Sequence, residues 1–566
     1  MFSQEQYEIP FIISFNEKNE IIIGQEAEQM NTYNPERTFF NLIKMFGKKY
    51  DEIKGMKELW PFKIYKDKKN RPFFLINFGK KDKIFYPEDL ISIYLKKLFK
   101  IFFKKIVTHE NLSDDIINIK LNLVICIPNN FTYIQRKLLE KIFERQIFPS
   151  EQNRKEENSY SNINNDIDNE NNNSLNEIKL YNNYLVTLKE IKLENISSIA
   201  ALCLKPINNK TKNNKIKSTN SLIINIGGAQ TNISIASYPS YRNKTKNFSN
   251  KKYFGIKSIS SIEIGSQDFT DAFVSDCLKE FDKNILKLCL ETPSALAKLR
   301  RSCKTTEKIF GENSHVEIKV NKLYGNNDLK MILNKSDYEK VCENLYQNIN
   351  LEIKKGIKSA KLSEINIDNI VLIGNISRSD KIKNMLKTLF KHNRLLFNQL
   401  SNISNNSDNN NDFYSVIGGV IQAKNYLYED NLNLNNEIEN IFSLNDISPI
   451  SFGVETLSGM MDFVIEKGTS IPVQKNKNIK IRNDGEKNLE IRIYEGEDNN
   501  VSKNQLISAA NINKGNFKSE KVGNNYIEIL IQFEISSDLN LSVYVLDIKT
   551  KKRRYECLIN IDIKKM

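Results

Sequence analysis

Two short apolar runs, Leu222–Ile226 and Ile233–Ala236, flank the pair Gly227-Gly228 and predict a buried strand, a tight turn and a second strand. Backbone N–H groups in a glycine turn of this kind can surround a phosphate. Turns that support phosphoryl transfer normally carry acidic side chains nearby, which organise Mg²⁺ and the attacking water. Asparagine stands at both places here, Asn225 and Asn232. We therefore expect the frame of a phosphate site without its catalytic residues.

Other chemistry-bearing side chains are sparse. The seven cysteines form no Cys-x-x-Cys pair, and His109, His315 and His392 lie far apart in the sequence. We therefore do not expect a His/Cys metal site or a His-based catalytic triad. An odd number of widely spaced cysteines indicates free thiols in a reducing compartment.

The composition is that of a globular protein. With 566 residues, 40% of them hydrophobic, the chain can form two to four domains with real cores. A net charge of +14 would suit a polyanion such as RNA or a ribosome, but lysine is spread along the chain and no Arg-rich helix is present. The N-terminus does not resemble a secretory signal, and lysines interrupt the apolar run 90–107, which predicts an amphipathic helix. We expect a cytoplasmic protein without membrane contact.

Short strands alternate with helices up to about residue 428, which is the order of an α/β fold. The predicted strands are 121–127, 222–226, 233–236 and 369–374, and the predicted helices are 133–143, 268–290, 294–309 and 380–390. From Ser448 onward, alternating apolar residues and frequent turn residues predict a β-sandwich with strands at 462–465, 478–482, 489–494, 527–535 and 539–546. Four polar segments predict disordered insertions, at 151–179, 205–220, 241–252 and 401–412.

Seven segments, in order, resemble motifs of the heat-shock protein 70 chaperone family. They are Pro128–Arg136, Gly265–Phe269, Val371–Arg378, Ile417–Ala423, Ser448–Thr456, Thr469–Pro472 and Tyr494–Glu497. The resemblance implies an actin-like, two-lobed nucleotide-binding domain over residues 1–428, a linker over 429–447 and a peptide-binding-type β-sandwich over 448–566. It also implies a set of cofactor-binding residues, namely Gly227, Gly228, Gly374, Arg378 and Asp412.

The family pattern predicts two missing parts. Pro10–Phe15 already matches the second part of the family's first lobe, so the N-terminal strands with the first phosphate loop are expected to be absent. The chain reaches Met566 soon after the β-unit, so we expect no helical lid over the peptide site.

Several positions that match the family's catalytic residues carry other side chains. Ile43 stands at the catalytic lysine, with Lys44 expected to point elsewhere, and Asn195 stands at a conserved-looking acid. Further substitutions are Asn225, Gln230, Asn232, Lys304, Glu307 and Gly311. The resemblance therefore predicts a non-hydrolysing relative that is not an enzyme, with no catalytic residue and no metal site. ATP or ADP is expected as a weak ligand that the protein does not require.

The branch that this pattern resembles is the member of the ribosome-associated complex that pairs with zuotin, a J-domain protein. It implies a J-domain co-chaperone and unfolded or nascent polypeptides as partners, with the ribosome as a further candidate. The alternative is an active ATP-dependent chaperone whose N-terminal phosphate-loop segment is missing from this sequence. A third reading, a relative that acts as an exchange factor, is disfavoured because a long acidic insertion and an extended helical C-terminus are not found.

Apolar residues recur inside the polar linker, at Ile441-Phe442-Ser443-Leu444. We expect this segment to dock in a groove of the nucleotide domain, since each large side chain gains about 1.5–3 kcal/mol on full burial. The other interpretation is that it packs only on its own β-domain.

Overall fold

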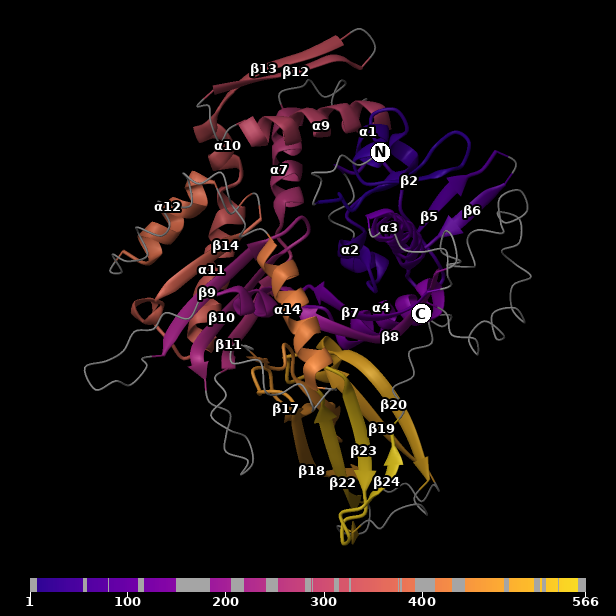
Figure 1. Ribbon diagram of the computed structural model, residues 1–566, viewed down its shortest axis with the longest axis vertical. Helices are drawn as coiled ribbons and strands as arrows, with labels where there is room; N and C mark the ends of the chain where they lie inside the picture. Colours follow the sequence, from indigo (N-terminus) through magenta and orange to yellow (C-terminus); the bar gives the residue numbers. More distant parts are fainter. Residues whose placement is uncertain are drawn as a thin grey trace.

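The computed structural model describes residues 8–53, 59–79, 81–109, 117–148, 184–204, 218–240, 253–279, 287, 289–309, 315–324, 327–374, 376, 379–391, 413–429, 443–482, 488–513, 520–521, 526–537 and 539–557. It is a mixed α/β structure in which two α/β lobes stand above a β-sandwich (Figure 1). The first lobe spans the described residues 8–204, and the second spans the described residues from 218 to 445.

Small sheets and four main helices build the first lobe. Strands β2-β1-β3 form one antiparallel sheet, β4-β5-β6 another, and β7 pairs with β8 in parallel. Their bounds are β1 Ile13–Phe15, β2 Ile21–Ile23, β3 Thr38–Phe39, β4 Tyr65–Lys66, β5 Pro72–Asn77, β6 Asp82–Phe85, β7 Ile117–Ile127 and β8 Tyr184–Asn195. The helices are α1 Gln25–Met30, α2 Leu42–Met45, α3 Pro87–His109 and α4 Tyr133–Lys141, with the short turns α6 Ile196–Ile199 and η5 Ala200–Cys203 before the second lobe.

Aromatic packing holds the first lobe together. Phe39 lies within 4.7 to 6.4 Å, between ring centroids, of Phe15, Phe62 and Phe74. Tilted and edge-on aromatic pairs of this kind add specific attraction to the burial of their large apolar surface. The lobe can therefore form a compact core even though its individual sheets are small.

The second edge of β7 has no strand partner among the described residues. The expectation of missing N-terminal strands stays a prediction, as does the expectation of no helical lid.

α3 confirms the amphipathic helix expected over 90–107. Within the described part of the chain, no helix is long and apolar enough to cross a membrane.

A five-stranded sheet in the order β14-β9-β10-β11-β15 forms the centre of the second lobe. Its strands are β9 Thr219–Ile226, β10 Thr231–Ser240, β11 Tyr253–Ile262, β14 Asn369–Ile373 and β15 Ser443–Asn445. The helices of this part are α7 Ser266–Lys279, α9 Pro293–Ile309, α10 Lys335–Val341, α11 Glu343–Ser359, α12 Asp380–Leu389 and α14 Tyr414–Glu429. The hairpin of β12 His315–Tyr324 and β13 Asn327–Asn334 projects beyond α10 (Figure 1).

Both faces of this sheet are buried. On one face, the side chains of Leu222, Ile224 and Ile233 pack with residues of α7, α9 and α11. On the other face, Ile223 and Ala236 pack with the turns α6 and η5. A sheet covered on both faces reads as a continuous apolar run, which explains why the sequence marks β9 so clearly.

The sequence-derived elements differ from the structure in a few places. Thr219 and Asn220, predicted to end an insertion, belong to β9 instead, because they pair with β10 and because the Asn220 amide N donates to Asp368 Oδ2 at 2.8 Å. Residues 205–217 and the other three predicted insertions lie outside the described residues, as do 280–286 of the predicted helix 268–290.

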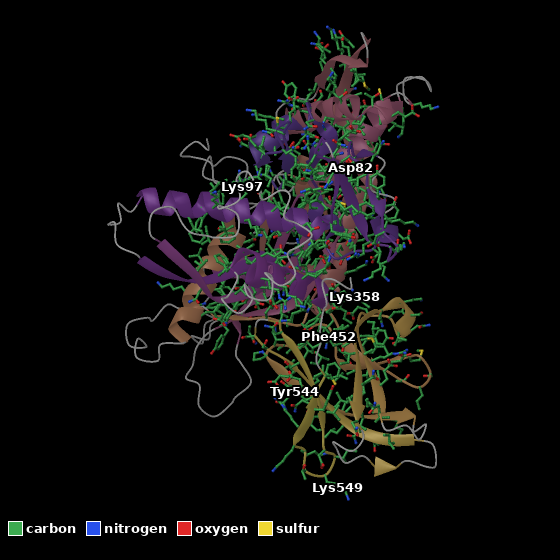
Figure 2. All side chains as sticks on the ribbon, turned by 90° about the vertical axis from the view of Figure 1, so that its right-hand side faces the viewer. Asp82, Lys97, Lys358, Phe452, Tyr544 and Lys549 are labelled. Atoms are coloured by element: carbon green, nitrogen blue, oxygen red, sulfur yellow. The ribbon has the colours of Figure 1, made fainter. Side chains whose placement is uncertain are left out.

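Two sheets form the β-sandwich, in the orders β17-β16-β19-β20 and β18-β22-β23-β24. Their bounds are β16 Phe452–Glu455, β17 Met461–Ile465, β18 Val473–Arg482, β19 Asn488–Glu495, β20 Gln505–Asn513, β21 Glu520–Lys521, β22 Tyr526–Ile535, β23 Leu541–Leu546 and β24 Arg553–Glu556. Figure 2 shows Phe452 where the sandwich meets the lobes, with Tyr544 and Lys549 further from them. One continuous cluster of buried side chains runs from the first lobe into the sandwich.

The end of the predicted linker forms a strand. β15 pairs in parallel with β11, Tyr253 opposite Ser443 and Gly255 opposite Asn445, and Leu444 packs on the apolar face that contains Phe254. This pairing confirms the docking for Ser443 and Leu444, which lie on the second lobe. Ile441 and Phe442 lie outside the described residues.

Candidate functional site

The two-glycine turn joins β9 to β10 and rests against the start of α7. The Gly227 amide donates to Gln230 O at 2.9 Å, which closes the turn. The amides of Ser266 and Gln267 donate to the carbonyl oxygens of Gly227 and Gly228 at 2.9 and 3.0 Å. Because carbonyl oxygens of the turn accept these two bonds, the start of α7 fixes the conformation of the turn. A helix start and a glycine turn together are suited to an anion such as phosphate.

Gly374 lies directly beside this turn. Its φ of +95° belongs to the left-handed region, and a Cβ on it would stand 2.1 Å from the carbonyl oxygen of Ile226. No side chain fits there, so glycine is required both by conformation and by space. The structure therefore brings together three of the five predicted cofactor residues, Gly227, Gly228 and Gly374. Arg378 and Asp412 lie outside the described residues.

A neutral network of amides and hydroxyls connects the lobes next to the turn. Asn232 Oδ1 accepts from the Asn129 backbone N–H at 2.9 Å and from Gln230 Nε2 at 2.8 Å. Asn129 Nδ2 donates to Ser197 Oγ, and Ser197 shares a hydrogen bond with Ser234, both at 2.6 Å. In both of its bonds Asn232 acts as an acceptor, a role that a carboxylate would also fill.

Lys44 supplies a cation at the interlobe cleft, which corrects the expectation that it points elsewhere. Its Nζ donates to both carboxylate oxygens of Asp268 on α7, at 2.5 and 2.6 Å, and only 3% of its side chain is exposed. α2 is one turn long, so its residues face different sides, and Ile43 packs on the core of the first lobe while Lys44 reaches across. Burial raises the pKa of Asp268 above its ordinary value, against the opposing effect of Lys44.

Two further ion pairs span the cleft, between Lys48 and Glu263 and between Lys304 and Glu28. The family pattern marks Lys304 only as a substitution, whereas in the structure its side chain pairs with the first lobe. The pairs are partly exposed, so each contributes little alone.

Glu307, one turn after Lys304 on α9, faces into the second lobe. Its carboxylate accepts from Thr270 Oγ1 at 2.8 Å and from Tyr338 Oη at 3.4 Å. Burial raises the pKa of Glu307 to about 7. The side chain therefore supports the packing of α7, α9 and α10 and does not line the cleft.

A buried polar seam connects the first lobe to the β-sandwich. Arg136 Nη2 on α4 donates to Asn195 Oδ1 at 2.9 Å, and Asn195 Nδ2 donates to Asp446 Oδ2 at 2.9 Å. The Tyr133 backbone N–H, at the start of α4, donates to Glu495 Oε2 at 2.7 Å. Burial raises the pKa of Asp446 to about 6 and of Glu495 to about 7.

Burial also lowers the pKa of Arg136 to about 10. Sequence reasoning used Arg136 and Glu495 only as parts of family motifs, and it expected Asn195 only as a lost acid. No pattern in the sequence shows that Tyr133 meets Glu495, 362 positions away, or that Asn195 meets Asp446, 251 positions away. The family motifs were the signal that could have led to them.

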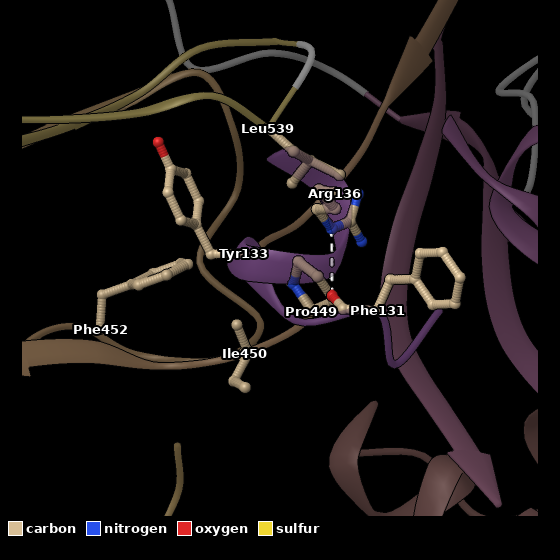
Figure 3. A pocket seen from close by; sticks show the side chains of 7 residues that line it. All are labelled: Phe131, Tyr133, Arg136, Pro449, Ile450, Phe452 and Leu539. Atoms are coloured by element: carbon tan, nitrogen blue, oxygen red, sulfur yellow. Dashed lines mark hydrogen bonds between the residues drawn. The ribbon is translucent and has the colours of Figure 1, made fainter. Parts of the chain in front are cut away.

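Apolar side chains seal this seam. The cavity between Phe131, Tyr133, Arg136, Pro449, Ile450, Phe452 and Leu539 holds about 10 Å³ (Figure 3). That is about the volume a single water molecule needs, so the seam is closely packed. Arg136 Nε donates to the Phe131 carbonyl at 3.1 Å, which fixes the guanidinium at the edge of the cavity (Figure 3).

Among the described residues, no group of three His, Cys, Asp or Glu side chains is close enough to hold a metal ion. The seven cysteines are all free thiols.

Comparison with known sequences places these features in context. A family described as "Hsp70 protein" matches residues 3–141 and 209–563. The chain is 24% identical over 551 residues to the "Heat shock cognate 70 kDa protein 3" of Dictyostelium discoideum, covering 96% of this chain and 74% of that protein. It is 24% identical over 552 residues to the "Chaperone protein dnaK" of Trieres chinensis, with the same two coverages.

It is also 22% identical over 501 residues to the "Heat shock 70 kDa protein" of Emericella nidulans, covering 88% of this chain and 65% of that protein. The chain therefore spans about two thirds to three quarters of the length of these relatives. The family consists of ATP-hydrolysing chaperones, so this match overturns the expectation that the chain is not an enzyme. Substitutions at single family positions were not sufficient grounds for that expectation.

Proposed function

Because the chain belongs to the Hsp70 family, we propose that it is a nucleotide-dependent chaperone. In this proposal ATP or ADP occupies the interlobe cleft of a domain over residues 1–428, and unfolded polypeptide occupies a domain over residues 448–566. The buried bond from the Tyr133 backbone N–H to Glu495 Oε2 carries the proposal, since it joins the two domains directly. The neighbouring bonds from Arg136 through Asn195 tie Asp446 of the linker to the first domain.

The proposed nucleotide site is supported by the three glycines that the structure brings together, Gly227, Gly228 and Gly374, which we call the glycine cradle. Gly228 has open space around its Cα, since a Cβ added there would meet no atom within 4 Å, whereas Gly374 is tightly enclosed. The N–H groups of such a turn can therefore approach a phosphate closely. The Lys44–Asp268 ion pair and the start of α7 lie next to this turn, since the Gly265 amide donates to Asp268 and the Gln267 amide donates to the carbonyl oxygen of Gly228.

The proposed polypeptide site is supported by exposed apolar side chains of the sandwich. Leu457, Met460 and Leu506 are 53%, 42% and 43% exposed. Two of them adjoin the small cluster of Met461, Tyr494 and Val501, since Met460 precedes Met461 and Leu506 pairs with Tyr494. Exposed apolar groups that gather around an apolar cluster are typical of a binding surface. We expect such a surface at the end of a sheet to bind an extended apolar peptide.

The proposal extends to a J-domain co-chaperone, to nascent chains at the ribosome and to a cytoplasmic location. The resemblance to the zuotin-partner branch and the net charge of +14 support it. Pull-down with a J-domain protein, and sedimentation with ribosomes at increasing salt, test this extension.

The coupling is tested with a fluorescent apolar peptide bound to the full chain. Adding ATP should accelerate peptide release, and Arg136→Ala should remove this acceleration while leaving ADP affinity within about twofold, because Arg136 does not touch the cleft. Lys549→Ala, at the far end of the sandwich, is the matched control. If peptide release by the unmodified chain does not respond to nucleotide, the proposal is wrong.

A further inference from the structure

Two buried thiols meet in the second lobe, away from the glycine cradle. The Sγ atoms of Cys277 and Cys303 are 3.9 Å apart, and the residues are 1% and 0% exposed. Cys277 lies in the last turn of α7 and Cys303 in the middle of α9. The pair is a contact between two helices and not a feature of one loop.

These two helices border the interlobe cleft. α7 begins where Gln267 N donates to Gly228 O of the phosphate turn. Arg300 on α9 donates to Gln267 Oε1 at 2.9 Å and pairs with Asp271, so the helices are also joined near the cleft. Lys304, the residue after Cys303, pairs with Glu28 of the first lobe. A change in the packing of α7 on α9 therefore reaches both the turn and the other lobe.

We propose that Cys277 and Cys303 are a reversible oxidation site that forms a disulfide with a small disulfide, such as oxidised glutathione, as the oxidant. Its effect on nucleotide binding rests on the function proposed above, whereas disulfide formation itself does not. None of the interlobe contacts requires a thiol at either position, so the pair is free for this chemistry.

The reaction is a pair of thiol–disulfide exchanges. The thiolate of one cysteine attacks a sulfur of oxidised glutathione, forms a mixed disulfide and releases one glutathione as a thiolate. The second cysteine then attacks the protein sulfur of the mixed disulfide and releases the second glutathione. Two protein thiols lose two electrons, one glutathione disulfide gains them, and the two thiol protons pass to the two released glutathione molecules.

Access comes from the end of α7. Cys277 is two residues from Lys279, the last residue of that helix, and terminal turns open more easily than helix interiors. The neighbouring Cys277 and burial together raise the pKa of the Cys303 thiol well above its ordinary value. Cys303 is therefore unreactive in the closed state, and we assign the first attack to Cys277.

Closing the bond must bring the two sulfur atoms closer, and we expect part of this movement to shift α7 against α9. The sulfur atoms are 3.9 Å apart, and a disulfide requires about 2.05 Å. Close packing transmits such a shift instead of absorbing it. Because Arg300 and Lys304 flank Cys303 on α9, their contacts with α7 and the first lobe change, and we expect ADP affinity to fall about fivefold or more.

The test uses the full chain, incubated in glutathione buffers from reducing to oxidising, alkylated and analysed by mass spectrometry. We expect a peptide that links Cys277 to Cys303, with Cys557 still reduced as a buried control in the sandwich. In Cys277→Ser and in Cys303→Ser the linked peptide should disappear. The inference is overturned if no such peptide forms in the folded chain, if it forms only in denaturant, or if Cys277 pairs with Cys289 or Cys342 instead.

Titration of the reduced and oxidised chains with ADP provides the second measurement. Weaker binding by the oxidised chain, restored by dithiothreitol and absent in Cys303→Ser, supports the coupling. Equal binding by the two forms overturns it. If the disulfide forms but the reduced chain binds no ADP, the function proposed above fails while the oxidation site stands.

Discussion

Lys44 of the first lobe donates to both carboxylate oxygens of Asp268 in the second lobe, at 2.5 and 2.6 Å. The Asp268 carboxylate also accepts from the Gly265 amide at 2.7 Å, just before α7. One ion pair thus connects the short helix α2, the start of α7 and the glycine turn behind it. It ties the two lobes together across the cleft.

Removing this pair should destabilise the protein. We expect Asp268→Ala to lower the free energy of unfolding by about 3 kcal/mol, because the 3%-exposed Lys44 ammonium is left buried without its partner. Denaturant unfolding measures the change. Glu317→Ala is the matched control, since its pair with Lys330 is largely exposed and should contribute little to stability. Equal losses in the two variants would contradict the role of the Lys44 pair.

Docking of the sandwich on the first lobe should weaken as pH rises. The docked pKa of Glu495 is raised to about 7 from an ordinary value of 4.5, so the docked form binds the proton more tightly. Its contribution to docking is therefore fully present below about pH 4.5 and is lost as pH rises through about 7. Asp446 acts in the same direction with a docked pKa of about 6.

Energy transfer between dyes on the first lobe and the sandwich, measured from pH 5 to 8.5, checks this expectation. Glu495→Gln mimics the protonated side chain and should flatten most of the pH dependence, and Glu490→Gln is an exposed control on the same strand. Arg136, Asp446, Glu140 and Glu194 remain as the other charges near the seam. A response that persists unchanged in Glu495→Gln would rule out this group as its source.

Substitutions at two glycines of the glycine cradle should change different properties, namely ADP binding for Gly228 and stability for Gly374. A Cβ on Gly228 meets no atom within 4 Å, so Gly228→Ala should fold with nearly unchanged stability but reduce ADP affinity, because the methyl group occupies the space where phosphate approaches the turn. We expect a reduction of about tenfold or more, since a lost charged hydrogen bond costs about 1.5–3 kcal/mol. Calorimetric titration and thermal unfolding measure the two effects.

Gly374→Ala should instead lose stability, by about 2 kcal/mol or more, because of strain at positive φ and the clash with Ile226 O. Gly79→Ala is its control, with a φ of +85° but open space around it, and should show the strain alone. If Gly374→Ala and Gly79→Ala are equally stable, the close approach of β14 to β9 is not as tight as described.

Leu444→Asp should release the strand β15 from β11. Leu444 is partly buried against the apolar face that contains Phe254, so a carboxylate there loses apolar contact and must be desolvated, at a cost of about 1–3 kcal/mol. Hydrogen exchange of the β11 amides should increase. Ile332→Asp, a 73%-exposed position on β13, should leave exchange at β11 unchanged. Unaltered protection of β11 in Leu444→Asp would show that the pairing does not depend on this side chain.

In the second lobe the sequence predicted β9, β10, β14, α7, α9 and α12, because each is marked by its own residues, but it did not predict β11, β12, β13, α10 or α11. β9 is an unbroken apolar run with a glycine pair at its end, and α9 begins at Pro293, so the expected bounds differ by few residues from those observed. In the sandwich, alternation located β17, β18, β19, β22 and β23 but not β16, β20, β21 or β24. The predicted bounds differ from the observed ones, too short for β18 and too long for β23, because pairing partners, not local pattern, set where a strand ends.

The site was predicted only where backbone geometry dominates. Gly374 was predicted from the family motif Val371–Arg378, and its positive φ and close approach to Ile226 explain why glycine stands there. Lys44 was missed because a one-turn helix has no fixed face, so spacing alone could not tell whether it or Ile43 reaches the cleft. Glu495 and Asp446 were missed for a different reason: their shifted pKa values arise from burial between parts of the chain that lie far apart in sequence.

The sandwich is fastened to the lobes at two places. β15 joins it to the second lobe, and the contact of Tyr133 with Glu495 joins it to the first. A body attached to both arms of a hinge cannot follow both when the hinge angle changes. Any rotation of one lobe against the other must therefore strain or break one of these two attachments. The contacts of the sandwich thus depend on the angle between the lobes.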